Sequence, residues 1–527
     1  MRLLYSCSAL LLLLLIPREC QSGNILVFPT EGSHWLNMDI LLQALHARGH
    51  SLTVLRSSKS WYIKEKSPYY SIYTVEAERS LDQAFITKII RESIDFERGA
   101  LPIMNFLNMA IGMMGIFIEA HSAVTEVVSA ILDDQVLMET LKASKFDLLL
   151  TDPCWGGGAI IAKYLNLPLV YNVRWLIPSE AHMEIAPSPL SYIPITGTGN
   201  TNKMTFIQRV KNMIFHLLVL NQNHIVSRQV YQKVCDKYLG PDTDFKELLL
   251  DADIWLMRVD FVFEFPRPTM PNVVYMGGFQ CKPAKPLPAD LEEFVQSSGE
   301  HGVIIMSLGS FISELPSDIS DEIAAAFAKV PQKVIWRHKG DKPATLGNNT
   351  LLVDWMPQND LLGHPKVKLF VAHGGTNGVQ EALYHGVPVV GLPIFFDQYD
   401  NLLRLKERGG AEILSLQTVD KDDNFLKAIQ TVLNEPSYRM NMQRLSRLHK
   451  DTPMKPMDSA LFWIEFVMRH KGAAHLKSHS LKMPWYSYYS IDVFLFLAGV
   501  LLLFVLITFM LLRCLCTKMC KKKVKHE

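Results

Sequence analysis

The chain has 527 residues, of which 49% are apolar and 20% charged. At ~150 residues per domain, this length predicts two to four domains. Lys and Arg number 53 and Asp and Glu number 52. The resulting net charge of +1 gives no electrostatic case for nucleic acid as a partner.

Residues 1–22 predict a secretory signal peptide. Arg2 supplies a short positive region, and the apolar run of residues 9–16 follows it. Cleavage after Ser22 leaves Gly23 as the mature amino terminus. An uncleaved anchor is the alternative, but the apolar run is too short to span a bilayer.

The next part of the chain alternates strands with helices. We expect a strand over 24–29, an amphipathic helix over 36–48 and a strand over 51–55. The pattern repeats with a strand over 146–151, a helix over 156–165 and a strand over 168–172. Such alternation predicts a parallel sheet covered by helices.

Residues 99–118 contain no charge and need separate consideration. Pro102 and the asparagines are poor for a lipid-facing helix, so we expect a core or pocket segment rather than a membrane span. Its methionines could line an adaptable apolar site, with ordinary core packing as the alternative. These methionines are Met104, Met109, Met113 and Met114.

Residues 282–290 read KPAKPLPAD and predict a stiff linker. After it the alternation restarts, with strands at 302–308, 333–337, 351–355, 369–372 and 388–392 and helices at 318–329, 377–385 and 396–408. We therefore expect an α/β protein with two doubly wound domains, residues 23–281 and 291–480, that face a ligand cleft. Helices after about residue 455 are expected to pack back on the first domain.

Several chemistries lack their motifs. No Gly-x-Gly-x-x-Gly, P-loop or Gly-x-Ser-x-Gly sequence occurs, which counts against dehydrogenases, ATPases and esterases. Cys154, Cys235 and Cys281 do not form a CxxC pair, so no metal site is expected and at most one disulfide can form. Asn348 begins a glycosylation sequon.

The carboxyl-terminal region predicts a membrane anchor. Residues 493–512 are 20 residues without charge, enough to span a bilayer, and the basic tail of residues 513–527 follows. This asymmetry places the tail in the cytosol and the preceding domains in the lumen, as in a single-pass type I protein. Lys523 and Lys525 match a dilysine retrieval signal, which indicates the endoplasmic reticulum membrane.

The segment from Trp355 to Gln398 carries the chemistry. The expected strand 369–372 ends at His373, glycines follow, and a helix begins near Asn377. Backbone N–H groups and small residues at such a helix start form a site for phosphate. Trp355, at the expected end of a strand, could stack on a flat base, and Asp397 and Gln398 suit sugar hydroxyls.

This segment resembles the signature of the UDP-glycosyltransferases, in particular the membrane-bound animal UDP-glucuronosyltransferases. The resemblance covers the signal, the GSHW sequence near the start, the linker, the SLGS sequence at 307–310, the anchor and the tail. It implies a GT-B fold and a UDP-sugar co-substrate held by the second domain, without a further cofactor. It also implies a small lipophilic acceptor, contact with membrane lipids, and association with itself or with related transferases.

The resemblance assigns donor-binding residues. Trp355 and Gln358 match uracil and ribose contacts, and Glu381 matches a ribose contact. The diphosphate contacts are matched by Ser310, His373, Gly375, Thr376 and Asn377, and the sugar contacts by Asp397 and Gln398. Arg258 matches an arginine that faces the glucuronate carboxylate, since a guanidinium binds a carboxylate bidentately. A surface arginine is the alternative reading of Arg258.

His34, expected at the end of the first strand, matches the family's general base, and Asp152 matches the aspartate that orients it. Imidazole can take the proton of a neutral hydroxyl, and a carboxylate on its other nitrogen fixes the tautomer. The expected function is inverting transfer of glucuronic acid from UDP-glucuronate to hydroxyl groups of small lipophilic acceptors. The alternatives are another UDP-sugar donor, glucose or galactose, or a catalytically silent membrane binding partner.

Overall fold

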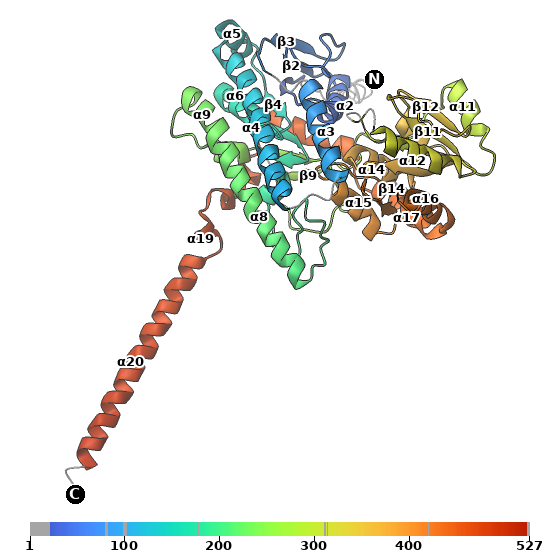
Figure 1. Ribbon diagram of the computed structural model, residues 1–527. Helices are drawn as coiled ribbons and strands as arrows, with labels where there is room; N and C mark the ends of the chain where they lie inside the picture. The colour runs from blue at the N-terminus through green and yellow to red at the C-terminus, as the bar shows by residue number, and fades with distance from the viewer. Residues whose placement is uncertain are drawn as a thin grey trace, which may run out of the picture. The chain divides into compact units, whose positions relative to one another are not determined.

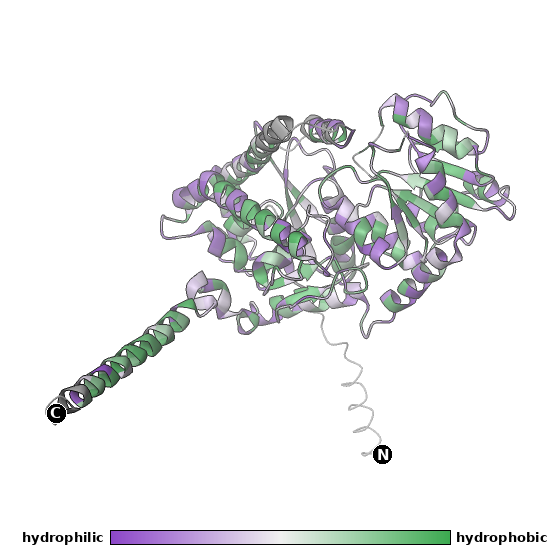
Figure 2. Ribbon diagram, turned by 60° about the horizontal axis from the view of Figure 1, so that its bottom comes forward, coloured by the Kyte–Doolittle hydropathy of each residue, from purple (hydrophilic) through white to green (hydrophobic). Residues whose placement is uncertain are grey.

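The computed structural model describes residues 22–79, 83–98, 103–176, 179–309, 312, 315–419 and 421–523 (Figure 1). The chain divides into two units, Met1–Lys477 and Ser478–Glu527. The first unit holds two large parallel sheets, and Figure 2 shows hydrophobic residues along their strands.

The first sheet has seven strands in the order β3-β2-β1-β4-β5-β8-β9, and all neighbours pair in parallel. The strands are β1 Asn24–Phe28, β2 Ser51–Ser57, β3 Ser71–Val75, β4 Leu148–Thr151, β5 Leu169–Val173, β8 Ile254–Met257 and β9 Val273–Tyr275. Phe28, the last residue of β1, pairs with Thr151, the last residue of β4. The loops after these two central strands therefore start side by side at the carboxyl edge of the sheet.

Helices cover both faces of this sheet. They are α2 Ser33–Ala47, α3 Gln83–Arg98, α4 Ile103–Asp133, α5 Gln135–Ala143, α6 Gly157–Leu165, α7 Ala181–Ile185, α8 Phe206–Val226, α9 Gln232–Tyr238 and α10 Phe245–Leu250. A π-helical turn at Ser227–Tyr231 joins α8 to α9. Two short strands, β6 Trp175–Leu176 and β7 Ser179–Glu180, pair antiparallel with each other. The late helix α18, Pro456–His470, packs on α2, β8 and β9. Its buried residues Leu461 and Ile464 complete the core on that face.

Within the part of the chain that the structure describes, two helices are long and apolar enough to cross a membrane, Met114–Asp133 within α4 and Ile491–Met519. Val128 and Ile131 of α4 are fully buried in the core beside β1 and β4, so this part of α4 serves as a core helix. Residues 99–102 and the side chains of Met104, Met109 and Met113 lie outside the described part of the chain, and Met114 is half-buried.

The second sheet has six parallel strands in the order β12-β11-β10-β13-β14-β15. The strands are β10 Val303–Ser307, β11 Lys333–Arg337, β12 Thr350–Val353, β13 Val367–Ala372, β14 Val389–Gly391 and β15 Ala411–Ile413. The helices are α11 Ala289–Gln296, α12 Ser317–Ala328, α13 Gln358–Leu362, α14 Thr376–His385, α15 Gln398–Glu407, α16 Asn424–Asn434 and α17 Pro436–Lys450. Two parallel sheets with helices on their faces confirm the predicted fold class.

The second unit consists of short turns, α19 Trp485–Tyr488 and the long helix α20 Ile491–Lys523. Its apolar side chains from Val493 to Met519 are exposed along the helix. The helix is longer than the predicted span of residues 493–512, because it continues through the basic residues after Leu512. Lys525 of the dilysine sequence lies outside the described residues, as does the predicted signal up to residue 21.

Candidate active site

His34 and Asp152 meet at the carboxyl edge of the first sheet. Asp152 follows β4 directly, as expected. His34 does not end the first strand: it is the second residue of α2, because Gly32, at φ +69°, turns the chain into the helix before it. Nδ1 of His34 lies 2.7 Å from Oδ2 of Asp152.

The environment of Asp152 keeps its carboxylate ionised. Its Oδ1 accepts a hydrogen bond from the backbone N–H of Cys154 at 3.0 Å. Burial by itself raises the pKa of Asp152, but the charges of His34 and Arg258 outweigh it and hold the pKa below its usual range. His34 is 22% exposed, so its ring can be reached from outside the protein while Asp152 cannot.

Arg258 follows β8 and is 5% exposed, so the surface-arginine reading is wrong. Its Nη1 lies 3.1 Å from Oδ2 of Asp152, and its Nη2 lies 3.3 Å from Nδ1 of His34. Among the described residues, Nη1 has no aligned hydrogen-bond acceptor. The guanidinium is therefore a buried positive charge beside His34 and Asp152. Its Nη1 can still donate a hydrogen bond to a ligand.

His373, Gly375, Thr376 and Asn377, which are expected to hold the diphosphate, follow β13. The ring of His373 sits between Gly309 and Gly375, where an added Cβ would lie 2.6 Å and 2.4 Å from its Nε2. Burial lowers the pKa of His373 to about 4, so the imidazole is neutral at pH 7 and carries one N–H to donate. Ser310 lies outside the described residues.

Thr376 and Asn377 form the first turn of α14, which contacts the helix that carries His34. Nδ2 of Asn37 donates to Oδ1 of Asn377 at 2.9 Å and so joins the helix of His34 to the signature helix. Asn37 follows His34 by three residues on α2, which places both on one face. The helical period could therefore have identified Asn37 as a site residue from the sequence.

Asp397 and Gln398 begin α15 as expected, and both are buried. Oδ2 of Asp397 accepts from Nδ2 of Asn401 at 2.8 Å and lies 3.4 Å from Oγ1 of Thr376. Oε1 of Gln398 accepts from the backbone N–H groups of residues 394 and 395. This fixes the amide of Gln398, so that its NH₂ group provides the remaining donors.

The three residues expected at the nucleoside come from two places: Trp355 and Gln358 follow β12, and Glu381 lies on α14, after β13. Trp355 is 72% exposed and does not end the strand, because the β11–β12 ladder stops at the pair Arg337 and Val353. Nε2 of Gln358 donates to Oε2 of Glu381 at 2.6 Å. Burial raises the pKa of Glu381 to about 7.

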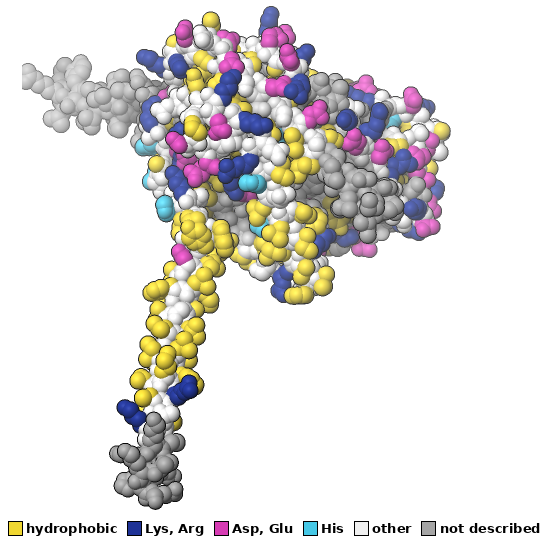
Figure 3. All heavy atoms as spheres, turned by 60° about the vertical axis from the view of Figure 1, so that its left-hand side comes forward, with side chains coloured by type: hydrophobic (Ala, Val, Ile, Leu, Met, Phe, Trp, Pro, Cys, Tyr) yellow, Lys and Arg dark blue, Asp and Glu magenta, His cyan; other side chains and the backbone are white. Residues whose placement is uncertain are grey.

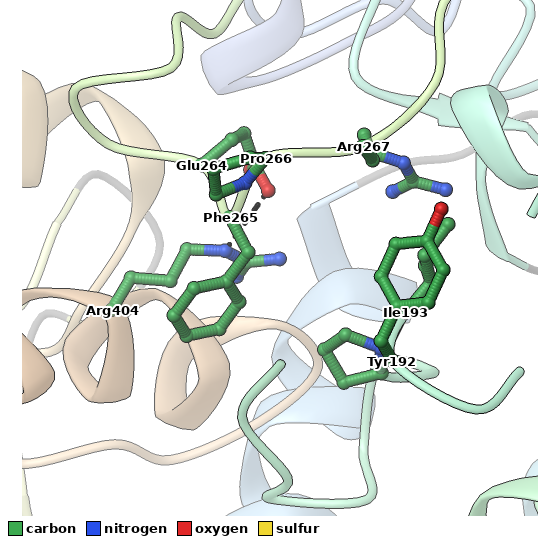
Figure 4. Close-up of a pocket in the computed structure, with 8 residues that line it drawn as sticks. Tyr192, Ile193, Glu264, Phe265, Pro266, Arg267 and Arg404 are labelled. Carbon is green, nitrogen blue, oxygen red and sulfur yellow. Dashed lines mark hydrogen bonds and ion pairs between the residues drawn. The ribbon is translucent and has the colours of Figure 1, made fainter. Parts of the chain in front are cut away.

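Three buried arginines and two buried glutamates lie beside this site and were not identified from the sequence. Glu180 pairs with Arg174, Arg267 and Arg404, and Glu264 pairs with Arg174 and Arg404. Figure 4 shows Arg404 of α15 reaching Glu264 beside a narrow pocket. Arg174 directly follows β5, and a charge after a buried strand is the signal that could have identified it.

An apolar cavity lies at the carboxyl ends of β1 and β2. It is lined by Phe28, Pro29, Thr30, Glu31, Leu55, Ser57, Ile63, Ala123, Val124, Val127 and Trp155. The loop that leads from β1 to His34 therefore forms part of its wall. Cys154, Cys235 and Cys281 are free thiols, and Asn348 is exposed at the start of its sequon.

Known proteins resemble the chain along nearly its whole length. The family model "UDP-glucoronosyl and UDP-glucosyl transferase" matches residues 23–526. The chain is 45% identical over 483 residues to human UDP-glucuronosyltransferase 2A2, covering 90% of the chain and 89% of that protein. It is 43% identical over 518 residues to rat UDP-glucuronosyltransferase 2B1, covering 97% and 96%.

Solved structures show the same fold at low identity. The calicheamicin glycosyltransferase CalG4 matches with a TM-score of 0.56 and 18% identity, over 84% of this chain and 98% of that one. A UDP-glucosyltransferase from Polygonum tinctorium matches with a TM-score of 0.57 and 15% identity, over 85% and 99%. The two sheets thus have the GT-B arrangement, and the chain belongs to the family of UDP-glucuronosyl and UDP-glucosyl transferases.

Proposed function

We propose that this enzyme transfers glucuronic acid from UDP-glucuronate to hydroxyl groups of small lipophilic acceptors, with inversion at the sugar carbon. The observation that carries the proposal is the contact of 2.7 Å between Nδ1 of His34 and Oδ2 of Asp152, beside the start of α14. The names of the two glucuronosyltransferase relatives support the choice of sugar.

The base acts on the acceptor hydroxyl. With Nδ1 held by Asp152, Nε2 is the ring nitrogen of His34 that takes the proton as the oxygen attacks the sugar carbon. UDP leaves from the opposite side of that carbon, which gives inversion. Asp152 fixes the tautomer and stabilises the imidazolium that forms, and Arg258 keeps Asp152 ionised.

The donor is assigned to the second half of the first unit. The exposed ring of Trp355 provides a stacking surface for uracil. Gln358 and Glu381 suit the ribose hydroxyls, and the amino end of α14, with His373, Gly375, Thr376 and Asn377, suits the diphosphate. Asp397 and Gln398 suit the sugar hydroxyls. The UDP-sugar is the co-substrate, and no step in this scheme calls for a further cofactor.

The apolar cavity beside the β1–α2 loop supports a lipophilic acceptor. Phe28, Leu55 and Val124 offer apolar contacts, and Trp155 offers an aromatic face. An acceptor held there would reach the edge of the sheet from which His34 projects. Transfer assays with a panel of phenols and steroidal alcohols would identify the chemical class of the acceptor.

Buried Arg258 favours glucuronate over a neutral sugar. Among the described residues, Nη1 of Arg258 makes no hydrogen bond, so it can donate to the carboxylate of glucuronate. Glucose and galactose have no negatively charged group that would need this positive charge. A catalytically silent binding partner would not need the paired His34 and Asp152. Both alternatives remain outcomes of the experiments below.

We further propose that the enzyme resides in the endoplasmic reticulum membrane with its catalytic unit in the lumen. The apolar stretch Ile491–Met519 and the basic tail support this orientation, and the glucuronosyltransferase relatives support a membrane enzyme. A glycan on exposed Asn348, and association with related transferases, belong to the same proposal.

The test of the mechanism compares His34→Ala with His46→Ala, an exposed histidine on the same helix. Transfer from UDP-glucuronate to a steroidal alcohol should fall at least about a hundredfold in His34→Ala, because general base catalysis contributes ~10²–10⁴-fold. His46→Ala should keep full activity, and UDP binding should survive in both variants. Asp152→Asn should lose less. Unchanged alcohol turnover in His34→Ala would end this mechanism.

A further inference from the structure

Helix α8 exposes its apolar side and turns polar side chains toward the protein, whereas an ordinary surface helix does the opposite. Its exposed apolar side chains, here named the α8 face, are Phe206, Ile207, Val210, Met213, Ile214, Leu217 and Leu218. They recur at intervals of three and four residues, so they share one side of the helix. Phe206 and Ile207, at its beginning, are 68% and 72% exposed.

The side of α8 that faces the protein is held by amides. Nδ2 of Asn212 donates to the carbonyls of Leu190 and Ile193 at 2.9 Å and 2.8 Å, and its Oδ1 accepts from the N–H of Ile195 at 2.7 Å. Asn223, one of the helix's other buried residues, donates to Glu184. Turning the helix to bury its apolar face would break these buried hydrogen bonds, which is costly.

The charged side chains that α8 itself carries are all positive. Residues 206–226 contain no Asp or Glu, whereas Arg209 and Lys211 lie on the helix and Lys203 precedes it. All three cations are in exposed residues. Figure 3 shows hydrophobic side chains with basic ones beside them at the lower end of the first unit, over the beginning of α8. An exposed apolar stripe flanked only by cations is typical of helices that lie on anionic lipid surfaces.

We propose that the α8 face is a membrane-binding surface, which lies in the interfacial layer of a bilayer that contains anionic lipids. This inference rests on the membrane location proposed above, in which the candidate span Ile491–Met519 keeps the first unit at a lipid surface. The cations suit lipid phosphates, and the apolar side chains suit the boundary between headgroups and acyl chains. A second copy of the chain fits this surface less well, because its own α8 cations would repel these cations.

The experiment places an environment-sensitive fluorophore on one introduced cysteine of the full chain. Cys514, Cys516 and Cys520 are replaced by Ser, and the probe is attached at Phe206→Cys or Leu217→Cys. The same protein without the introduced cysteine measures the labelling of the remaining thiols Cys154, Cys235 and Cys281, and this background is subtracted. The matched control is Val136→Cys, on α5, because Val136 is also apolar and is 76% exposed. Each protein is reconstituted in phosphatidylcholine vesicles with or without phosphatidylserine, and retained UDP binding shows that it is folded.

Lipids that carry a spin label near the headgroup should quench the probes at positions 206 and 217 about twofold or more, and should leave position 136 nearly unaffected. Arg209→Glu should reduce this quenching in phosphatidylserine vesicles more than in phosphatidylcholine alone. Quenching equal to that at position 136 would overturn the proposal. A second result would also overturn it: a blue-shifted probe emission that spin-labelled lipid does not quench and that shifts back as the protein is diluted in lipid. That result would indicate self-association of the protein.

Discussion

Nη1 of Arg258 lies 3.1 Å from Oδ2 of Asp152, the same oxygen that contacts His34. The carboxylate thus balances a permanent charge on one side and an imidazole on the other. Burial raises the pKa of Asp152, and the charge of His34 and then that of Arg258 lower it below its usual range. Arg258 is a permanent charge, so in the mechanism proposed above it supplies a part of this effect that does not depend on the proton of His34.

The first prediction concerns the two roles proposed for Arg258. Arg258→Ala should lower kcat with both UDP-glucuronate and UDP-glucose by about tenfold or more, because it leaves buried Asp152 without its cation. The loss with UDP-glucuronate should be about tenfold greater, since the donor carboxylate also loses its partner. Steady-state kinetics with each donor at saturating acceptor measure both effects.

The control for this prediction is the double variant with Asp152→Asn. If Arg258 acts only through Asp152, the double variant should be no worse than Asp152→Asn alone with either donor. An extra loss confined to UDP-glucuronate would support the carboxylate contact. Equal losses with the two donors would restrict Arg258 to its role beside Asp152.

The second prediction concerns Glu381, whose pKa burial raises to about 7. An ionised carboxylate accepts two ribose hydroxyls better than a protonated one, so UDP affinity should fall about tenfold as the pH drops from 8 to 6. Glu381→Gln has no such titration, and its UDP affinity should show only the pH dependence of the ligand. Equilibrium binding of UDP at each pH measures this, and parallel curves would refute it.

The same shift predicts a change in stability of known sign. A carboxyl whose folded pKa exceeds its unfolded value stabilises the fold below the unfolded pKa, and this contribution is lost as the pH rises through about 7. The free energy of unfolding should therefore fall between pH 5.5 and pH 8 more in the wild-type protein than in Glu381→Gln. Thermal unfolding without ligand tests the sign.

Periodicity and strand ends identified much of the fold, and failed where tertiary contacts decide. Strand 333–337 was predicted with the observed bounds, because the apolar residues Val334, Ile335 and Trp336 stand between Lys333 and Arg337. The strand β9 was not predicted, although its three residues Val273, Val274 and Tyr275 form an apolar run of the same length. His34 was assigned to a strand end because nothing in the local pattern shows that Gly32 starts the helix early.

The candidate site, like the fold, could be predicted from the sequence only in part. Asp152 and Asp397 follow buried strands or begin a helix, so their placement could be predicted from the sequence. The neighbours of Arg258 could not, because they come from β4 and α2, far away in the chain. The family resemblance suggested a ligand contact for Arg258, and its burial beside Asp152 supports a second role.

The third prediction concerns topology. With the catalytic unit in the lumen, protease added to sealed microsomes should remove only the tail after residue 512, a loss of a few kilodaltons. Detergent should make the first unit accessible, which serves as the control. Cleavage within residues 23–477 in intact vesicles would contradict the orientation proposed here.

The fourth prediction concerns the buried ion network beside the sugar site. Glu264 accepts from Nη1 of Arg174 at 2.6 Å and from Nε of Arg404, on α15, at 3.0 Å. Glu264→Gln leaves Arg174 and Arg404 with Glu180 as their one remaining shared glutamate, so three buried guanidinium groups then share a single glutamate. The loss should cost about 3–5 kcal/mol of unfolding free energy. Thermal or denaturant unfolding of the purified full chain measures the loss.

The matched control is Asp423→Asn, which breaks the exposed pair of Asp423 with Lys329 and should leave the midpoint unchanged. The network also lies next to the sugar site proposed above, since Nε of Arg174 is 4.0 Å from Oδ2 of Asp397. Glu264→Gln should therefore raise the KM for UDP-glucuronate, while UDP, which lacks the sugar, should bind nearly as before. A stable Glu264→Gln variant with wild-type KM would show that the network contributes neither to stability nor to sugar binding.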